Sequence, residues 1–528
     1  MILKPDERAA LELRGIYEQA GYKKYKMGRF EEYSLYAENK EFLSSDKVVT
    51  FTDLDGRLMA LKPDVTLSII KNTKATREKG EKLYYIENIY RESKESHTFK
   101  EINQLGLEML GDVDINGVTE VASLAARSLL SISGDYILEI SHMDFVLELL
   151  NDLNAGESVG RKLISHIRDK NADGVRKTGE KAGIDEKKLE VICMLTSLYG
   201  DAENTIKRAG EIVINETMGK ALSELSLICG ELSKTVGKDN IQVDFSIVND
   251  IDYYNGIIFR GYINKLARSV LAGGQYDRAM KKFGKDIGAI GFAIYLNEIG
   301  MLSDETYKPD TDGGLPHRDE SGFLSIALPK GRLGDKVYKM FASIGYDCPG
   351  FDEDSRKLVF ENSEKKIRFL LVKPGDVAIY VEHHAADAGV VGKDILLETP
   401  ADVYELMDLN IGKCRMAVAA PSGYVEDMDR PLRVASKYVN IAKDFYSGQN
   451  REIDLIKLTG SIELAPILGL SDVIVDLVET GNTLRDNDLV ILEEFRQISA
   501  RFIANKSSFK FKNDIINDIT KRLEEIIK

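Results

Sequence analysis

The stretch SDVIVDLVETGNTLRDNDL, residues 471–489, decides how the second half of the chain folds. Val473, Ile474 and Val475 form an apolar run that predicts a buried strand. A turn with Thr and Gly follows, and a helix can begin directly after it. Such a turn offers free backbone N–H groups and hydroxyls, and the helix dipole adds a partial positive charge. The stretch therefore predicts an α/β fold with a site for a terminal phosphate.

The turn itself holds the residues expected to bind that phosphate. Gly481 would let the backbone approach an anion closely, and Asp472 and Asp476 bracket the preceding strand. The alternative is an ordinary strand–helix turn in which Thr480 or Thr483 caps the helix. The complete predicted loop is Glu479, Thr480, Gly481, Asn482, Thr483 and Leu484.

Cationic turns follow other apolar runs of the second half. Lys330 and Arg332 end the run ALPKGRLG, Arg356 lies in FDEDSRKLVF, and Lys373 follows IRFLLV. Open α/β sheets bind ligands at the carboxyl ends of their strands, so these cations are candidate ligand contacts. The alternative is solvated loop charge, which is the usual fate of Lys and Arg.

Length and composition bound the possible functions. The chain has 528 residues, enough for about three or four domains. Its 71 Lys and Arg against 86 Asp and Glu give a net charge of −15, which disfavours broad binding to nucleic acid. Four scattered cysteines make a zinc site and disulfides improbable and indicate a reducing, cytoplasmic location. No run of about 18 apolar residues predicts a membrane span.

One stretch has the composition of a linker. Residues 302–321 are rich in Asp, Glu, Gly and Pro, which predicts domains at 1–301 and 322–528. The first half opens with an amphipathic helix whose apolar stripe is expected to be Leu11, Leu13, Ile16 and Tyr17. Strand-like runs flank a helical region at residues 143–235. This order predicts an α+β domain with an antiparallel sheet and a helical insertion.

The second half alternates strands and helices more regularly. The run FLSIALP is followed by an expected helix over Gly334–Ile344, and further apolar runs are CRMAVAA and VIVDLV. This alternation predicts an α/β domain with largely parallel strands.

Residues 323–528 resemble the short-form catalytic subunit of ATP phosphoribosyltransferase. The shared motifs, in order, are ALPKGRL, DSRKL, KPGDVAIYVEHHAADAGVVGKD, LTGSIELAPILGLSDVIVDLVETGNTL and SARFIAN. The resemblance implies a two-lobed α/β fold like a periplasmic binding protein, with the active site in the cleft. It implies transfer of the phosphoribosyl group of 5-phosphoribosyl 1-pyrophosphate to ATP, with release of pyrophosphate, as the first step of histidine biosynthesis. Short forms lack the C-terminal regulatory domain of the long form.

The resemblance also assigns roles to residues. It implies that the loop 479–484 binds the phosphoribosyl group, and that Asp472 and Asp476 contact ribose or magnesium. Mg²⁺ would be held mainly by the substrates. Catalysis would come from holding two polyanions in line and neutralising the leaving group, because adenine N1 needs no strong base. The implied ATP-binding residues are Lys330, Gly331, Arg332, Arg356 and Lys373, of which Lys330, Arg332 and Arg356 join the two aspartates as catalytic candidates.

The first half resembles the catalytic domain of histidyl-tRNA synthetase, a class II fold. The motifs are FTDLDGRLMALKPDVT, YRESKESHTFKEINQLGLEMLG, DIDYYNGIIF, LAGGQYD and IGAIGFAIYLNEI. They imply a polar pocket that could accept an α-amino group and imidazole donors. The alternative is that the tyrosines only pack strands and that Glu108 is a surface charge. The implied pocket residues are Asp64, Thr66, Arg91, Gln104, Glu108, Tyr254 and Tyr276.

Departures from the synthetase motifs point to lost adenylation. Asn249 and Glu298 stand where the synthetase has arginines that hold ATP, and Ser93 replaces a glutamate. An acid in place of an arginine inverts the charge at a polyphosphate site. The combination resembles the histidyl-tRNA synthetase-like regulatory subunit of ATP phosphoribosyltransferase, here fused in front of the catalytic part.

The leading hypothesis is therefore a fused phosphoribosyltransferase with histidine feedback. Its partners are expected to be ATP, 5-phosphoribosyl 1-pyrophosphate and L-histidine, with neither nucleic acid nor a membrane. Because both families form dimers, a homo-oligomeric dimer or tetramer is expected. The two alternatives are an active histidyl-tRNA synthetase and a non-catalytic intracellular ligand sensor.

Overall fold

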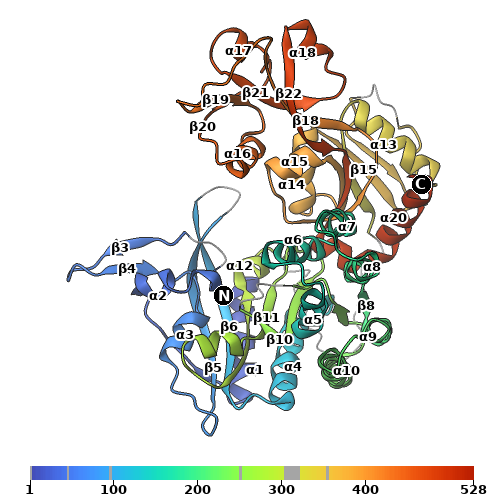
Figure 1. Cartoon of the computed structure of the whole chain (residues 1–528). Coiled ribbons are helices and arrows are strands. Elements are labelled where there is room, and N and C mark those ends of the chain that lie inside the picture. Colours follow the sequence, from blue (N-terminus) through green and yellow to red (C-terminus); the bar gives the residue numbers. More distant parts are fainter. Residues whose placement is uncertain are drawn as a thin grey trace. The chain divides into compact units, whose positions relative to one another are not determined.

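The computed structural model describes residues 3–43, 47–93, 98–248, 253–302, 322–351 and 356–527. The chain divides into two compact units, Met1–Glu320 and Ser321–Lys528, whose elements Figure 1 labels. The expected linker, residues 302–321, lies outside the described residues except for Leu302. Within the described ranges, no helix is long and apolar enough to cross a membrane.

The first unit is built on a nine-stranded sheet with the order β1-β5-β6-β12-β11-β10-β7-β9-β8. The pairings from β5 through to β7 are antiparallel, as the sequence predicts. Strands β2, β4 and β3 form a small separate sheet. The strands are β1 Lys23–Lys24, β2 Phe30–Glu32, β3 Thr50–Thr52, β4 Leu58–Leu61, β5 Glu81–Glu92, β6 Phe99–Gly111, β7 Tyr136–His142, β8 Tyr199–Asp201, β9 Ile241–Asp244, β10 Asn255–Ile263, β11 Leu271–Gln275 and β12 Gly288–Tyr295.

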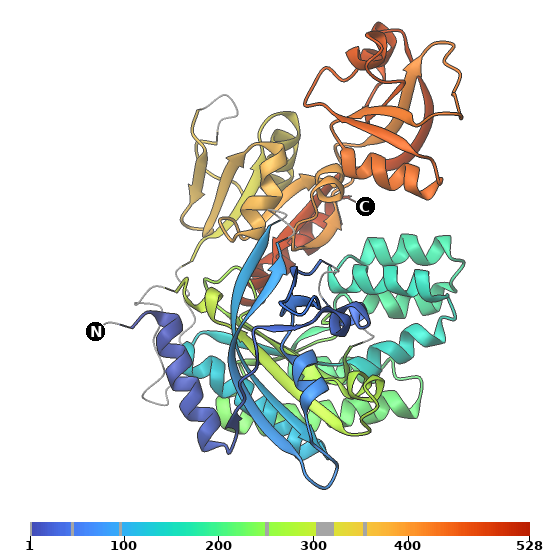
Figure 2. The ribbon, with the colours of Figure 1, turned by 90° about the vertical axis from the view of Figure 1, so that its left-hand side faces the viewer.

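A helical insertion separates the strands of this unit, and Figure 2 shows its helices gathered on one side of the sheet. Their apolar faces join the main core of the unit, for example through Leu163, Ile167 and Leu189. The α+β class with a helical insertion is thereby confirmed. The helices of the unit are α1 Pro5–Gln19, α2 Tyr33–Ala37, the 3-10 turn η1 Lys40–Phe42, α3 Thr66–Asn72, α4 Ile115–Ile132, α5 Met143–Asp152, α6 Glu157–Arg168, α7 Ala172–Lys181, α8 Glu186–Met194, α9 Ala202–Gly210, α10 Glu216–Val236, α11 Asp277–Lys282 and α12 Leu296–Ile299.

Helix α1 confirms the expected amphipathic helix but corrects one member of its apolar stripe. Ala9, Leu13 and Tyr17 are buried at a spacing of four residues, whereas Leu11 is 57% exposed. Leu11 lies about 200° around the helix from Leu13, on the opposite face. The four-residue spacing of these side chains, and not apolar character alone, therefore identifies the buried face of the helix.

The second unit consists of two lobes, each with its own sheet, and Figure 2 shows them as separate bodies. The first lobe carries the sheet β14-β15-β13-β16-β23-β17 and the second carries β20-β19-β21-β18-β22. The two-lobed architecture implied by the family resemblance is thereby confirmed. The strands are β13 Leu324–Pro329, β14 Val359–Asn362, β15 Ile367–Val372, β16 Ala388–Gly392, β17 Val403–Asp408, β18 Cys414–Pro421, β19 Leu432–Ser436, β20 Ile453–Lys457, β21 Val473–Val478, β22 Leu489–Ile498 and β23 Ala500–Asn505.

The helices of the second unit connect these strands. The expected helix over Gly334–Ile344 is present, displaced by one or two residues, as α13. The helical elements are α13 Arg332–Ser343, the 3-10 turn η2 Pro374–Asp376, α14 Val377–Glu382, α15 Lys393–Glu398, α16 Val439–Gly448, α17 Leu464–Ile467, α18 Asn482–Asp486, α19 Lys506–Phe511 and α20 Asn513–Ile527.

The expectation of largely parallel strands in the second unit was wrong. Strands β13, β15 and β16 are parallel neighbours, and so are β20, β19 and β21. Strands β18, β22, β23 and β17, in contrast, pair antiparallel. The chain passes from the first lobe to the second after β17 and returns through Ser499, so the return strands run against their neighbours. A strand's apolar composition does not reveal this direction.

Candidate functional site

The predicted phosphate loop lies at the carboxyl end of β21, between the strand and α18. Gly481 adopts a left-handed conformation with φ of 74°, which glycine enters without steric cost. Leu484 is buried in the same core cluster as Ile474 and Val478 and so anchors the turn to the core of the second lobe. Because its side chain faces the core, Leu484 can offer a ligand only its backbone.

The loop presents donors to solvent. Thr480 and Thr483 are exposed, and within the described residues no hydrogen bond uses the backbone N–H of Gly481, Thr483 or Leu484. The N–H of Asn482 has only a 3.5 Å contact with Thr480 Oγ1. Consecutive backbone N–H groups and hydroxyls on one turn form a concave surface suited to an anion.

Two arginines that the sequence did not single out border this loop. Arg415 on β18 donates through Nη1 to the carbonyl oxygen of Glu479 at 3.2 Å and also pairs with Glu494. Arg485 contacts the side-chain oxygen of Asn482. Arg485 directly follows the predicted loop, so extending the motif by one residue would have found it. Arg415 lies 64 residues before Glu479 in the sequence, on β18, and no motif around it indicates that it approaches the loop.

The cations of the first lobe lie along one edge of its sheet. Strands β13 and β15 are parallel, with Pro329 opposite Val372, and Lys330 and Lys373 are the next residues on each. The N–H of Lys330 donates to the carbonyl of Val372 at 2.8 Å. Because β14 runs antiparallel to β15, Arg356 enters the sheet from this same edge.

One contact brings the two predicted motifs together. Arg332, at the start of α13 in the first lobe, lies 3.6 Å through Nη2 from Oε2 of Glu479 in the second lobe. Both side chains are exposed, by 90% and 62%, so the pair itself contributes little stability. The pair is informative about geometry, because it shows that the carboxyl edges of the two sheets lie close to each other.

Asp476 lies on β21 just before the loop. Its side chain is half-buried and accepts a hydrogen bond from the N–H of Leu477 at 2.8 Å. Burial raises the pKa of Asp476 to about 6, and the nearby charge of Glu463 adds to this. The carboxylate is therefore one whose charge changes close to neutral pH.

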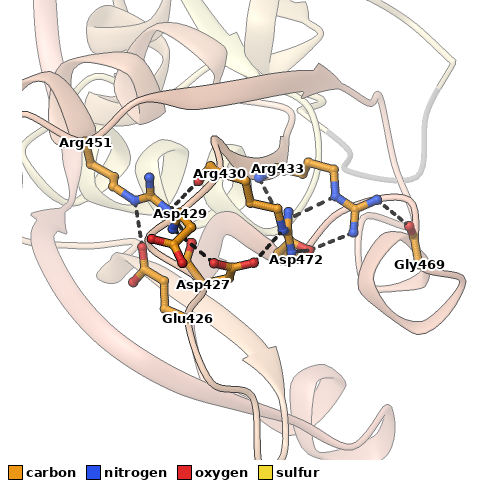
Figure 3. Close-up of polar contacts among 8 residues, drawn as sticks. All are labelled: Glu426, Asp427, Asp429, Arg430, Arg433, Arg451, Gly469 and Asp472. Carbon is orange, nitrogen blue, oxygen red and sulfur yellow. Dashed lines mark hydrogen bonds and ion pairs between the residues drawn. The ribbon is translucent and has the colours of Figure 1, made fainter.

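Asp472 does not lie beside Asp476, although the sequence analysis placed the two at opposite ends of one apolar run. It lies at the opposite, amino end of β21, where Arg430 and Arg433 hold its carboxylate between their guanidinium groups (Figure 3). The distances are 2.8 and 3.0 Å from Arg430, and 2.7 and 3.3 Å from Arg433. These bonds hold the pKa of Asp472 far below its usual value. We therefore remove Asp472 from the expected substrate contacts, because its oxygens are already engaged and face away from the loop.

Replacing Asp472 with asparagine is expected to destabilise the second unit by about 1–3 kcal/mol, because two arginines lose their shared anion. Since the folded-state pKa is lowered, this contribution is present above pH ~4 and is lost as the pH falls through the folded-state pKa. Thermal inactivation of the full chain at pH 7 measures the effect. Asp427→Asn is the matched control: it removes the charge that pairs with Arg430 Nε at 3.2 Å, while its amide oxygen can still accept the 3.0 Å hydrogen bond from the N–H of Asp429. Equal inactivation temperatures for the two variants would contradict the structural role.

All seven predicted pocket residues of the first unit line a single cavity of about 140 Å³. A cavity of this size accommodates a small ring in known proteins. Glu108 of β6 forms its floor, accepting a hydrogen bond from Thr66 Oγ1 at 3.0 Å and one from Tyr276 Oη at 2.6 Å. The structure thus excludes the alternative that Glu108 is a surface charge, since it is only 2% exposed. The seven residues are Asp64, Thr66, Arg91, Gln104, Glu108, Tyr254 and Tyr276.

Charges are arranged unevenly around this cavity. Arg91 Nη2 lies 3.1 Å from Asp64 Oδ2 and so neutralises it. Burial raises the pKa of Glu108 to about 8, with a smaller contribution from Asp64. Glu108 is therefore a carboxyl that remains largely protonated at neutral pH until a cation arrives. An ammonium or imidazolium group would supply that cation.

Two glycines on neighbouring strands line the cavity, and one of them makes room for Glu108. A methyl group on Gly291 would lie 1.7 Å from Glu108 Oε2 and 2.5 Å from the carbonyl of Leu107. A methyl group on Gly273 would lie 2.3 Å from the carbonyl of Gly291. Glycine at these strand positions therefore keeps the cavity open. The sequence analysis did not identify them, nor the lining aromatics Phe42, Tyr85, Tyr253 and Tyr295.

The departures from the synthetase motifs are only partly visible. Asn249 lies outside the described residues. Asn297, next to Glu298, accepts a hydrogen bond from the N–H of Asn103 at 2.6 Å and so ties α12 to β6. The side chain of Asn297, the residue before Glu298, therefore stabilises the fold locally.

Comparisons with known proteins match both units. A family model described as ATP phosphoribosyltransferase matches residues 373–525, and one described as histidyl-tRNA synthetase matches residues 4–299. The ATP phosphoribosyltransferase of Brachyspira hyodysenteriae is 60% identical over 205 residues, which is 39% of this chain and 100% of the relative. That of Clostridioides difficile is 50% identical over 205 residues, covering 39% of this chain and 98% of the relative.

A solved structure is similar to the chain in fold. It is described as an ATP phosphoribosyltransferase regulatory subunit/histidyl-tRNA synthetase from Bacillus halodurans, and it is 20% identical with a TM-score of 0.51. The likeness covers 70% of this chain and 94% of that one.

Proposed function

The chain belongs to the ATP phosphoribosyltransferase family in its second unit and to the histidyl-tRNA synthetase family in its first, and from this we propose how its residues divide the work. The second unit is an ATP phosphoribosyltransferase: it transfers a phosphoribosyl group to ATP in the first step of histidine biosynthesis. The first unit is a regulatory domain with a synthetase-like fold. We assign the regulatory part to residues 1–301 and the catalytic part to residues 322–528.

The loop 479–484 is proposed to bind the 5-phosphate of the phosphoribosyl group. Its unused N–H groups and the hydroxyls of Thr480 and Thr483 supply donors, and Gly481 keeps the backbone accessible. Arg485, which contacts Asn482, adds positive charge beside the turn. These groups would hold the sugar so that its anomeric carbon faces the first lobe.

The edge of the first lobe is proposed to receive ATP and the pyrophosphate leaving group. Lys330, Arg332, Arg356 and Lys373 approach this edge, and their charges would neutralise pyrophosphate as it departs. The attacking N1 of adenine is unprotonated near neutral pH, so the residues need only align it with the anomeric carbon. The observation that carries this assignment is the approach of Arg332 to Glu479, which joins the two edges.

Magnesium is proposed as the metal of the reaction. Within the described residues, no group of three or more His, Cys, Asp or Glu side chains could hold a metal ion, so the donor set does not fit a dedicated site. Mg²⁺ keeps few protein ligands and prefers phosphate oxygens, so we assign it to the substrates rather than to side chains. When bound, it would supply further positive charge to the pyrophosphate.

The cavity of the first unit is proposed to bind L-histidine. Glu108 and Asp64 would accept the ammonium and imidazole N–H groups, while Tyr254, Tyr276 and Gln104 line the remaining walls. Feedback then requires that histidine bind one state of the enzyme better than another. We also propose that the chain acts as a homo-oligomer, a dimer or tetramer, in which both units are present in equal number.

The direct test is to incubate the full chain with ATP, 5-phosphoribosyl 1-pyrophosphate and Mg²⁺ and to follow phosphoribosyl-ATP by its absorbance. Product is expected, and added L-histidine is expected to reduce its rate. Absence of product would contradict the catalytic assignment. A rate unaffected by histidine would contradict the regulatory assignment alone. Histidine-dependent exchange between ATP and pyrophosphate would instead revive the synthetase alternative.

Asp476 gives the reaction an expected pH dependence. If its carboxylate contacts the ribose, kcat/KM falls as the pH drops through about 6, because protonation removes the charge. Asp476→Asn is expected to lower kcat/KM at pH 8 and to abolish this acidic limb. A pH profile from 5 to 9 on both proteins measures it. The same acidic limb in Asp476→Asn would assign the titration to another group.

A further inference from the structure

The two lobes of the catalytic unit are joined by a narrow connection. The chain crosses between them at residues 409–413 and again at Ser499. The crossings run side by side, since Leu409 N–H donates to the carbonyl of Ala500 at 2.9 Å and Ala500 N–H donates to that of Ile411 at 2.9 Å. Two adjacent strands form a hinge that permits rotation. Other contacts must therefore fix the angle between the lobes.

One such contact is a buried hydrogen bond between the lobes. Tyr438, just before α16 of the second lobe, donates from its hydroxyl to Asp394 Oδ2 of the first lobe at 3.1 Å. Tyr438 is 5% exposed and Asp394 is 8% exposed. Leaving a buried carboxylate without such a donor costs free energy, so this bond favours one orientation of the lobes relative to each other.

Glu398, one turn further along α15, binds the amino end of α16 in the second lobe. Its carboxylate accepts the backbone N–H of Asn440 at 3.0 and 3.2 Å and that of Ile441 at 3.2 Å. Its carbonyl oxygen accepts the side-chain amide of Asn440 at 2.8 Å. Tyr438, the residue directly before α16, does not cap the helix with its own side chain. Glu398 thus caps α16 from the other lobe, and its charge suits the helix N-terminus.

These contacts join the sheet edges that carry the substrate groups. Helix α15 follows β16, a parallel neighbour of β13, so it lies at the edge of Lys330. Helix α16 follows β19, a parallel neighbour of β21, so it lies at the edge of the loop 479–484. A connection between α15 and α16 therefore sets the separation of the two edges.

We propose that Asp394, Glu398 and Tyr438 are positioning residues for phosphoribosyl transfer: they form an inter-lobe clamp that holds the phosphate loop and the cationic edge at the separation the reaction requires. None of them needs to touch a substrate. The clamp acts by alignment, to which in-line displacement between two bound polyanions is sensitive. The inference rests on the proposed assignment of these two edges to the substrates.

The clamp is tested with Tyr438→Phe and Glu398→Gln in the full chain, singly and together. Each single variant is expected to lower kcat/KM for both substrates at least tenfold, and the pair to lower it further. The matched control is Tyr346→Phe, which removes a tyrosine–aspartate bond of 2.7 Å to Asp518 within the first lobe. That control is expected to lose comparable thermal stability and to retain kcat/KM within twofold.

A distance measurement separates alignment from general destabilisation. Spin labels on Lys336→Cys and Lys443→Cys, one exposed position in each lobe, report the inter-lobe distance in chains diluted with unlabelled protein. A narrow distribution is expected in the parent and control chains, and a broad one in the double clamp variant. Unchanged distances, or kcat/KM within twofold of the parent, would overturn the proposal. If the parent chain made no product, the substrate assignment would fail, while the distances would still decide whether the clamp fixes the lobes.

Discussion

Replacing Thr480 and Thr483 together with alanine is expected to lower kcat/KM for 5-phosphoribosyl 1-pyrophosphate by roughly 10²- to 10⁴-fold. Each hydroxyl would donate a hydrogen bond to a charged phosphate, and such bonds contribute about 1.5–3 kcal/mol each. Both side chains are exposed, so their loss removes ligand contacts and not core packing. Initial rates of phosphoribosyl-ATP formation, with each substrate varied in turn, measure the effect.

The control for this pair is Thr520→Ala. Thr520 lies on α20. Within the described contacts, its hydroxyl donates only to the carbonyl oxygen of Ile516, at 2.8 Å. Its replacement is expected to leave kcat/KM unchanged. If the double loop variant retained the parent kcat/KM, the phosphate would have to be bound elsewhere. That result would falsify the loop assignment and, with it, the proposed orientation of the substrates.

Replacing Gly291 with alanine is expected to abolish the response to histidine while leaving phosphoribosyl transfer without histidine intact. The new methyl group would fall 1.7 Å from Glu108 Oε2 and 2.5 Å from the carbonyl oxygen of Leu107, so the carboxyl group must leave the floor of the cavity and β12 must shift locally against β6. Loss of the group that accepts the ammonium or imidazole donors should weaken histidine binding by at least 100-fold. Calorimetric titration with L-histidine and the inhibition curve measure the two consequences.

Two measurements guard this prediction against simple misfolding. Gly230→Ala, on α10, adds the same methyl group with no heavy atom within 4 Å and should retain full inhibition. Glu108→Gln preserves the size of the side chain but removes its ability to ionise. Because the pKa of Glu108 is about 8, binding of a cation at pH 7 should release a proton in the parent chain and none in this variant. Histidine inhibition that survives in Gly291→Ala would move the regulatory site away from this cavity.

The sequence was most informative where chemistry is local. The turn at Glu479–Leu484 and the cations after β13 and β15 lie in contiguous motifs, whereas the seven pocket residues were implied by the family resemblance. Each motif places its groups through only a few backbone bonds, so tertiary packing had little freedom to move them. The order of strands and helices also indicated the α+β class of the first unit, whereas the two-lobed architecture of the second was implied by the family resemblance.

The tertiary structure decided which groups meet across the chain. Asp472 and Asp476 look equivalent in the sequence, yet Asp472 lies just before β21 and Asp476 near its carboxyl end. Arg430 and Arg433 from another segment neutralise only Asp472. Arg415 beside the loop, and Glu398 capping a helix of the other lobe, depend on strand order and on the return of the chain through Ser499. Local sequence sets which groups a segment offers. Their partners and protonation depend on distances and burial, which only the folded chain establishes.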